Sequence, residues 1–119
     1  MLWFIDGSPD LPDRVRDIIE SPDNDIEVSI ASFWEIGIKA GIGKLELSGS
    51  LFELAEIADQ QSIEIVPITI AAISICQKLV RHHKDPFDRI IASAAIVADR
   101  TVLSADKVFD LYEVRRIWQ

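Results

Sequence analysis

Three acidic residues carry the strongest chemical signal in the sequence. Glu35 follows the apolar segment IEVSI, Asp88 lies in the motif DPFD, and Asp106 follows the apolar run TVLS. Carboxylates that lie close together repel one another unless a cation neutralises them. Oxygen ligands without His or Cys suit Mg²⁺ or Mn²⁺, which keep bound water and take substrate phosphates. If the three acids converge, they predict phosphodiester hydrolysis by metal-activated water.

The pattern of apolar residues places these acids in an α/β fold. It predicts strands over 26–30, 63–68 and 101–104, and a short helical turn over 108–111 followed by an apolar segment over 114–118. The expected helices span 11–20, 32–40, 51–60, 69–80 and 85–100. This alternation predicts a central parallel sheet flanked by helices on both faces. Ligands of such sheets bind beyond the carboxyl ends of the strands, and all three acids fall at that edge.

Each acid also has a simpler explanation. Ser32 and Glu35 have the spacing of a capping box, and Asp85 and Asp88 have the same spacing. An acid in the first turn of a helix also suits the helix dipole. Asp106 could simply cap the turn that begins at Lys107. Taken one at a time these explanations are adequate, but a common location at one edge of the sheet favours the metal site.

Composition limits the classes of function. The 119 residues make one domain, and no apolar run is long enough for a membrane span. The N-terminus lacks a signal-peptide pattern, so we expect a cytoplasmic protein without membrane contact. The single cysteine, Cys76, excludes an internal disulfide. A net charge of −8 argues against a simple DNA-binding module, but it is compatible with a metal-dependent nuclease and with a basic protein partner.

Basic and aromatic residues surround the acids. The segment Arg81–Lys84, with His82 and His83, leads to Asp88 and is followed by Arg89. Either this segment is a solvated loop or, with Arg89, it contacts a phosphate backbone. Lys39 and Lys44 could contact phosphate from the helix that bears Glu35. Trp34 and Phe87 each precede an acid, and for both we expect packing rather than base stacking.

The combination of these motifs resembles a known family. SFWEI with Lys39 and GKL, then HHKDPFDR, then SAD, resemble the PIN-domain ribonucleases, and most closely the VapC-like toxins of bacterial toxin–antitoxin pairs. The resemblance runs from about Leu2 to the C-terminus. It implies a parallel sheet with helices on both faces, a Mg²⁺- or Mn²⁺-dependent endoribonuclease acting on RNA, a homodimer, and an antitoxin that inserts a peptide into the active groove. It assigns Glu35, Asp88 and Asp106 as catalytic, metal-binding acids.

The N-terminus departs from the family pattern. The family begins with a central strand ending in an Asp, followed by an apolar helix of the kind LLWWL. MLWFI matches that helix, which predicts that the first strand and its Asp are missing and that residues 1–119 are a single, N-terminally truncated PIN-like domain. Asp6 imitates the missing acid but lies too close in sequence to Glu35. Three explanations remain: an upstream start, recruitment of Met1–Asp6 as a substitute strand, or a decaying gene.

These observations lead to two hypotheses about function. The first is a metal-dependent endoribonuclease toxin that uses Glu35, Asp88 and Asp106. The alternative is a catalytically impaired PIN-like module that dimerises and binds an antitoxin without cleaving RNA. A phosphoacceptor receiver domain is a weaker possibility, because no Asp ends a middle strand and no Lys follows on a later strand in the required places.

Overall fold

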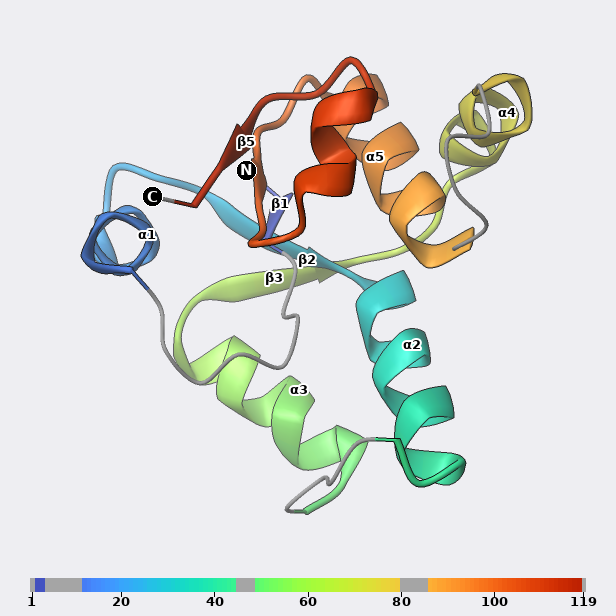
Figure 1. Cartoon of the computed structure of the whole chain (residues 1–119). Helices are drawn as coiled ribbons and strands as arrows, with labels where there is room; N and C mark the ends of the chain where they lie inside the picture. The colour runs from blue at the N-terminus through green and yellow to red at the C-terminus, as the bar shows by residue number, and fades with distance from the viewer. Residues whose placement is uncertain (1, 4–11, 45–48, 80–85, 119) are drawn as a thin grey trace.

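The described residues form a parallel sheet with helices packed around it. The computed structural model describes residues 2–3, 12–44, 49–79 and 86–118 (Figure 1). The strands of the sheet are β1 Leu2–Trp3, β2 Ile26–Ser29, β3 Ile63–Val66, β4 Val102–Leu103 and β5 Arg116–Ile117. The helices are α1 Asp13–Glu20, α2 Ile30–Gly41, α3 Leu51–Gln60, α4 Ile70–Lys78, α5 Pro86–Ala98 and the 3₁₀ helix η1 Lys107–Leu111. The strand order is β3-β2-β1-β4-β5, and every pair is parallel.

Strand β1 occupies the middle of this sheet, which corrects the expectation that the middle strand is missing. Leu2 pairs with Glu27 of β2 on one side and with Val102 of β4 on the other, and Trp3 pairs with Leu103. Without β1, the facing edges of β2 and β4 would present unpaired backbone N–H and C=O groups. Leu2–Trp3 therefore do not form the helix that the family pattern suggested. The pairing of Leu2–Trp3 agrees with recruitment of this segment as a strand, and the upstream start and the decaying gene stay open hypotheses. Asp6 lies outside the described residues.

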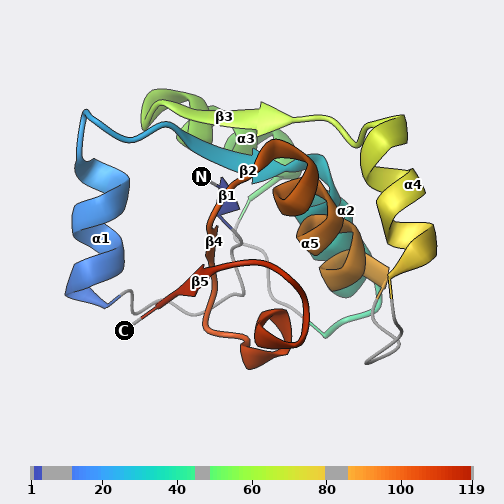
Figure 2. The same cartoon turned by 90° about the horizontal axis from the view of Figure 1, so that it is seen from above.

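Helices pack around the sheet (Figure 2), and two apolar clusters lie between the helices and the strands, as expected for a three-layer α/β fold. One cluster joins α5 and η1 to β4, and its buried members are Ala31, Ile91, Ala92, Ala95, Val102, Phe109 and Tyr112. The other joins β2 and β3 to α1 and α3, and its buried members are Ile26, Val28, Phe33, Ala58 and Ile63. Helix α5 buries mainly one face, formed by Asp88, Ile91, Ala92 and Ala95, and Val97 is 46% exposed, so the helix is less completely buried than predicted.

Helix α2 begins two residues earlier than the sequence predicted. Its N-cap is Ser29, whose side chain accepts a hydrogen bond from the Ala31 N–H at 3.1 Å. Ser32 therefore lies inside the helix, and it does not cap it. At the other end, Gly43 has a φ of 77° and the Lys44 N–H donates to the Lys39 carbonyl at 2.9 Å. This is a Schellman termination, in agreement with the predicted end of the helix at the glycines.

Two further observations complete the comparison with the predicted elements. The apolar segment over 114–118 contains β5, an edge strand that pairs with β4 and that the sequence pattern did not identify as a strand. None of the helices in the described ranges is long and apolar enough to cross a membrane.

Candidate active site

Glu35 is a buried carboxylate in the second turn of α2. Its relative exposure is 4%, whereas the preceding residue, Trp34, is 62% exposed. Because α2 starts at Ile30, Glu35 is too far from the helix start to act as the capping-box acid proposed from sequence. Its Oε2 forms an ion pair with Lys39 Nζ at 3.3 Å, and the Lys39 side chain is half exposed. Capping of the start of α2 therefore does not explain why the Glu35 carboxylate is buried.

Asp88 is a second buried carboxylate, in the first turn of α5. Its relative exposure is 5%. Its possible capping partner, Asp85, lies outside the described residues. Helix α5 packs against α2, and the two acids follow a pair of aromatic residues that join these helices. The ring centroids of Trp34 and Phe87 are 5.3 Å apart, and the ring planes are at 89°. Glu35 and Asp88 are thus presented by neighbouring helices.

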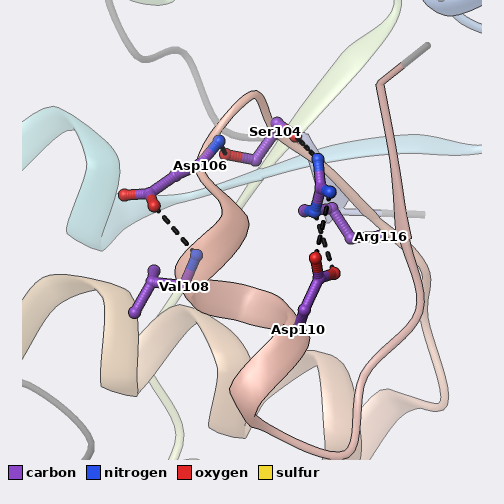
Figure 3. A network of polar contacts seen from close by, with 5 residues as sticks. All are labelled: Ser104, Asp106, Val108, Asp110 and Arg116. Carbon is purple, nitrogen blue, oxygen red and sulfur yellow. Dashed lines mark hydrogen bonds and ion pairs between the residues drawn. The ribbon is translucent and has the colours of Figure 1, made fainter.

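Asp106 is exposed and caps η1, as the simpler explanation predicted. Its Oδ1 accepts a hydrogen bond from the Val108 N–H at 2.9 Å, and its own N–H donates to Ser104 Oγ at 3.0 Å (Figure 3). Figure 3 shows its other carboxylate oxygen directed away from Val108. Asp106 lies just beyond the carboxyl end of β4, which is the edge where a parallel sheet binds ligands. Capping by one oxygen leaves the other available for a ligand.

The three acids do not form one compact cluster in this structure. Within residues 2–3, 12–44, 49–79 and 86–118, no three His, Cys, Asp or Glu side chains lie close enough to hold one ion. The chemistry of the donors nevertheless fits a hard divalent cation, because Glu35, Asp88 and Asp106 offer only carboxylate oxygen. Asp6 and the basic segment Arg81–Lys84 lie outside the described residues. The assignment of the three acids to a metal therefore stays a prediction.

Arg89 has a different role from the phosphate contact that the sequence suggested. Its Nη2 donates to the carbonyl oxygens of Cys76 at 2.7 Å and Leu79 at 3.3 Å. Cys76 lies in the last turn of α4 and Leu79 is the C-cap of that helix, where the helix dipole favours a cation. The Arg89 carbonyl also accepts a hydrogen bond from Ser93 Oγ at 2.7 Å. Arg89 thus fastens the start of α5 to the end of α4, and this nitrogen is occupied.

Tyr112 is a neighbour of Asp88 that sequence reasoning missed. It is buried at the end of η1, and burial raises the pKa of its hydroxyl above the usual value. The negative charge of Asp88 acts in the same direction, whereas the positive charge of Arg89 lowers the pKa. The hydroxyl therefore lies within electrostatic reach of both residues. Tyr112 is the sole tyrosine of the chain, and the sequence carries no other signal that points to it.

A second arginine, Arg116, pairs with an acid of η1. Arg116 of β5 forms a bidentate ion pair with Asp110, with Nε to Oδ1 at 2.9 Å and Nη2 to Oδ2 at 3.0 Å. The hydrogen bonds from Arg116 hold the pKa of Asp110 below its usual value, and Asp110 raises the pKa of Arg116 in turn. The two residues are six apart in sequence, a spacing that carries no helical or strand signal. Their pairing depends on the turn between η1 and β5.

Comparison with protein families assigns the chain. Residues 1–114 match the PIN domain. The chain therefore belongs to the PIN-domain family. Comparison with curated proteins gives no match.

Solved structures share this fold at low sequence identity. VapBC2 from Rickettsia felis, in a structure bound to a DNA fragment of its promoter, gives a TM-score of 0.66 at 16% identity. The match covers 100% of this chain and 100% of that chain. FitAcB from Neisseria gonorrhoeae gives a TM-score of 0.58 at 17% identity, covering 98% of this chain and 96% of that chain. FitAB bound to an IR36 DNA fragment gives 0.56 at 18% identity, with coverage of 98% and 94%. At these identities the similarity establishes the fold.

Proposed function

We propose that this chain is a metal-dependent endoribonuclease and the toxin of a toxin–antitoxin pair. Membership of the PIN-domain family supports the nuclease activity, because PIN domains are generally nucleases that use divalent metals. The observation that carries the proposal is the burial of two carboxylates, Glu35 and Asp88, on helices joined by an aromatic contact. A buried charge is costly unless it is compensated, and such groups are concentrated at functional sites.

The residues would divide the work as follows. Glu35, Asp88 and the uncapped oxygen of Asp106 would hold Mg²⁺ or Mn²⁺ at the carboxyl edge of the sheet. The ion would supply an activated water and stabilise charge on the attacked phosphate. Lys39, whose side chain is half exposed, would leave Glu35 and contact the RNA backbone. The basic segment Arg81–Lys84, which precedes Asp88 in the sequence, would contact the same backbone.

The direct test is cleavage of a labelled single-stranded RNA in Mg²⁺ or Mn²⁺. Glu35→Gln and Asp88→Asn should each abolish cleavage, and a chelator should abolish it in the wild type. Glu64→Gln is the matched control, since Glu64 is an exposed acid on β3 and should leave cleavage unchanged. Circular dichroism should show that all variants remain folded. Cleavage that persists in Asp88→Asn with the same metal dependence would refute the assignment.

A protein partner is the second part of the proposal. The similar structures are toxin–antitoxin complexes of the VapBC and FitAB type, which supports an antitoxin partner for this chain. Helix α2 offers a suitable surface, because Ile30, Trp34, Ile38 and Ile42 recur every four residues and are 41–62% exposed. Such a stripe fits an amphipathic peptide. We also propose that the chain acts in the cytoplasm and forms a homodimer. Light scattering of the purified protein would test the homodimer.

The antitoxin surface can be tested separately from catalysis. The protein encoded beside this chain should co-purify with it when the two are expressed together. Ile38→Glu should prevent that co-purification, whereas Glu64→Gln should not affect it. Retention of the partner by Ile38→Glu would place the interface elsewhere.

One observation favours the alternative of a binding module that does not cleave RNA. In the described part of the chain Glu35 is paired with Lys39, and no three acids are clustered. If this arrangement persists with metal present, the chain would bind its antitoxin without cutting RNA. Titration of the protein with Mn²⁺ distinguishes the two functions, because saturable binding that is lost in Asp88→Asn supports the nuclease.

A further inference from the structure

Asp106 lies in a short segment that connects a buried strand with a surface turn. The segment leaves β4 at Ser104 and enters η1, and Asp106 is its exposed corner (Figure 3). Local hydrogen bonds from Val108 to Asp106 and from Asp106 to Ser104 shape the corner itself. These bonds span only two residues each. They do not fix the corner relative to the sheet.

The side chain of Arg116 reaches both ends of this segment. Nη1 donates to the Ser104 carbonyl at 3.2 Å, while Nε and Nη2 form the bidentate pair with Asp110. Ser104 precedes Asp106 by two residues and Asp110 follows it by four. All three guanidinium nitrogens are occupied, and the side chain is 17% exposed. Arg116 is therefore not available to bind phosphate. Its contacts with Ser104 and Asp110, called the clasp below, connect the two ends of the segment (Figure 3).

The contacts of Arg116 are too weak for folding stability alone to account for them. Asp110 is half exposed, and an ion pair of that kind is screened by water and contributes little to folding. A planar guanidinium that binds a carboxylate in bidentate fashion instead fixes direction. Metal ligands must be held within about 0.5 Å of their working positions, and the groups that orient them matter almost as much as the ligands.

We propose that Arg116 is a positioning residue for Asp106: by binding Ser104 and Asp110 together, it holds the Asp106 carboxylate at the carboxyl edge of the sheet. The inference rests on the proposed function of Asp106 as a metal ligand. The charge of Asp106 acts on Arg116 as well, and it raises the pKa of the guanidinium alongside Asp110. The clasp and the acid that it positions are thus electrostatically coupled.

The test compares two arginines that form separate ion pairs, Arg116 with Asp110 and Arg100 with Glu27. Arg116→Met removes the clasp. Arg100→Met is the matched control, because Arg100 pairs with Glu27 at 3.0 Å beside the amino ends of the strands, away from the three acids. At saturating RNA, Arg116→Met should lower kcat about tenfold or more, the range seen when groups that orient metal ligands are lost. The KM for RNA should stay within about twofold, since Arg116 contacts no substrate.

Two further variants show whether the effect passes through the clasp. Asp110→Asn should lower kcat in the same direction. The double variant Arg116→Met/Asp110→Asn should lose no more than the worse single variant, because the two changes break one interaction. Arg116→Lys should recover part of the activity, because it keeps the charge but loses the fork. Equal kcat values for Arg116→Met and Arg100→Met, after correction for the folded fraction, would overturn the proposal.

Binding of Mn²⁺ without RNA separates this inference from the proposed function. Arg116→Met should weaken Mn²⁺ binding about tenfold, and Arg100→Met should leave it unchanged. If the wild type does not cleave RNA, the proposed nuclease fails, and this binding comparison alone decides the role of Arg116. Equal affinities in the two variants would then refute it.

Discussion

Trp34 and Phe87 pack edge to face, with ring centroids 5.3 Å apart, and this contact joins the two helices that carry the buried acids. Each ring belongs to the residue immediately before an acid, so movement of one helix relative to the other would move Glu35 relative to Asp88. The sequence suggested packing for these aromatic residues, and the contact confirms it. Trp34 nevertheless remains 62% exposed, so packing uses only part of its surface.

The aromatic contact should therefore couple stability to catalysis. Phe87→Leu removes the edge-to-face geometry but keeps an apolar side chain, and we expect it to cost about 1 kcal/mol beyond any change in buried area. Urea denaturation of Phe87→Leu, Trp34→Leu and the double variant measures the coupling. Strictly additive losses of unfolding free energy would show that the rings do not interact. Cleavage by the folded single variants should fall as well, because the relative placement of the helices changes.

Much of the fold was predictable because its cause is local. The alternation of apolar segments gave the parallel sheet, and Gly43 marked the end of α2 through a backbone conformation that favours glycine. The start of α2 was misplaced because Ser29 and Ser32 both fit an N-cap, and only pairing of Ile26–Ser29 with β3 shows where the strand ends. Strand β1 was only one of three alternatives, because the family pattern favoured a helix for MLWFI and the pairing of Leu2–Trp3 depends on partners far along the chain.

The site was predictable as a set of residues but not as an arrangement. Sequence identified Glu35, Asp88 and Asp106 as candidates, and the structure shows that the first two are buried while the third is a cap. Arg89 carries the same charge whether it binds phosphate or helix carbonyls, so its sequence context could not distinguish the two. The pairing of Arg116 with Asp110 arises from a turn that no periodic pattern describes.

The end of α2 offers a test with two neighbouring glycines. Gly41 lies inside the helix and Gly43 follows it at φ 77°, and a Cβ added at either would contact nothing within 4 Å. Gly41→Ala should stabilise the protein by about 0.5–1 kcal/mol, because alanine is the better helix former. Gly43→Ala should destabilise it by about 1 kcal/mol, because a side chain is strained in the left-handed region. Denaturant unfolding that gives the same sign for both would contradict the assigned termination.

The ion pair between Glu35 and Lys39 predicts competition between the lysine and a metal. Because Lys39 is half exposed, Lys39→Met should change the unfolding free energy by less than about 1 kcal/mol. A free energy of about 1 kcal/mol corresponds to about fivefold in affinity, so Mn²⁺ affinity should rise by up to about fivefold when the competing ammonium is removed. Calorimetric titration without RNA measures this change. Lys78→Met is the control, since Lys78 is exposed at the end of α4. Weaker Mn²⁺ binding in Lys39→Met would contradict the competition.

The Asp110–Arg116 pair predicts how stability depends on acid. Because Arg116 lowers the pKa of Asp110 in the folded protein, the unfolded chain binds a proton at this residue more readily than the folded chain. The stabilisation is therefore complete above the unfolded pKa of about 3.9, and it is lost as the pH falls through the lower folded value. Asp110→Asn and Arg116→Met should each remove this component. Their unfolding free energies, measured by urea denaturation, should approach that of the wild type as the pH falls below about 4. A constant difference between wild type and Asp110→Asn over that range would show that the ion pair does not persist in solution, and the clasp around Asp106 would then lack its main contact.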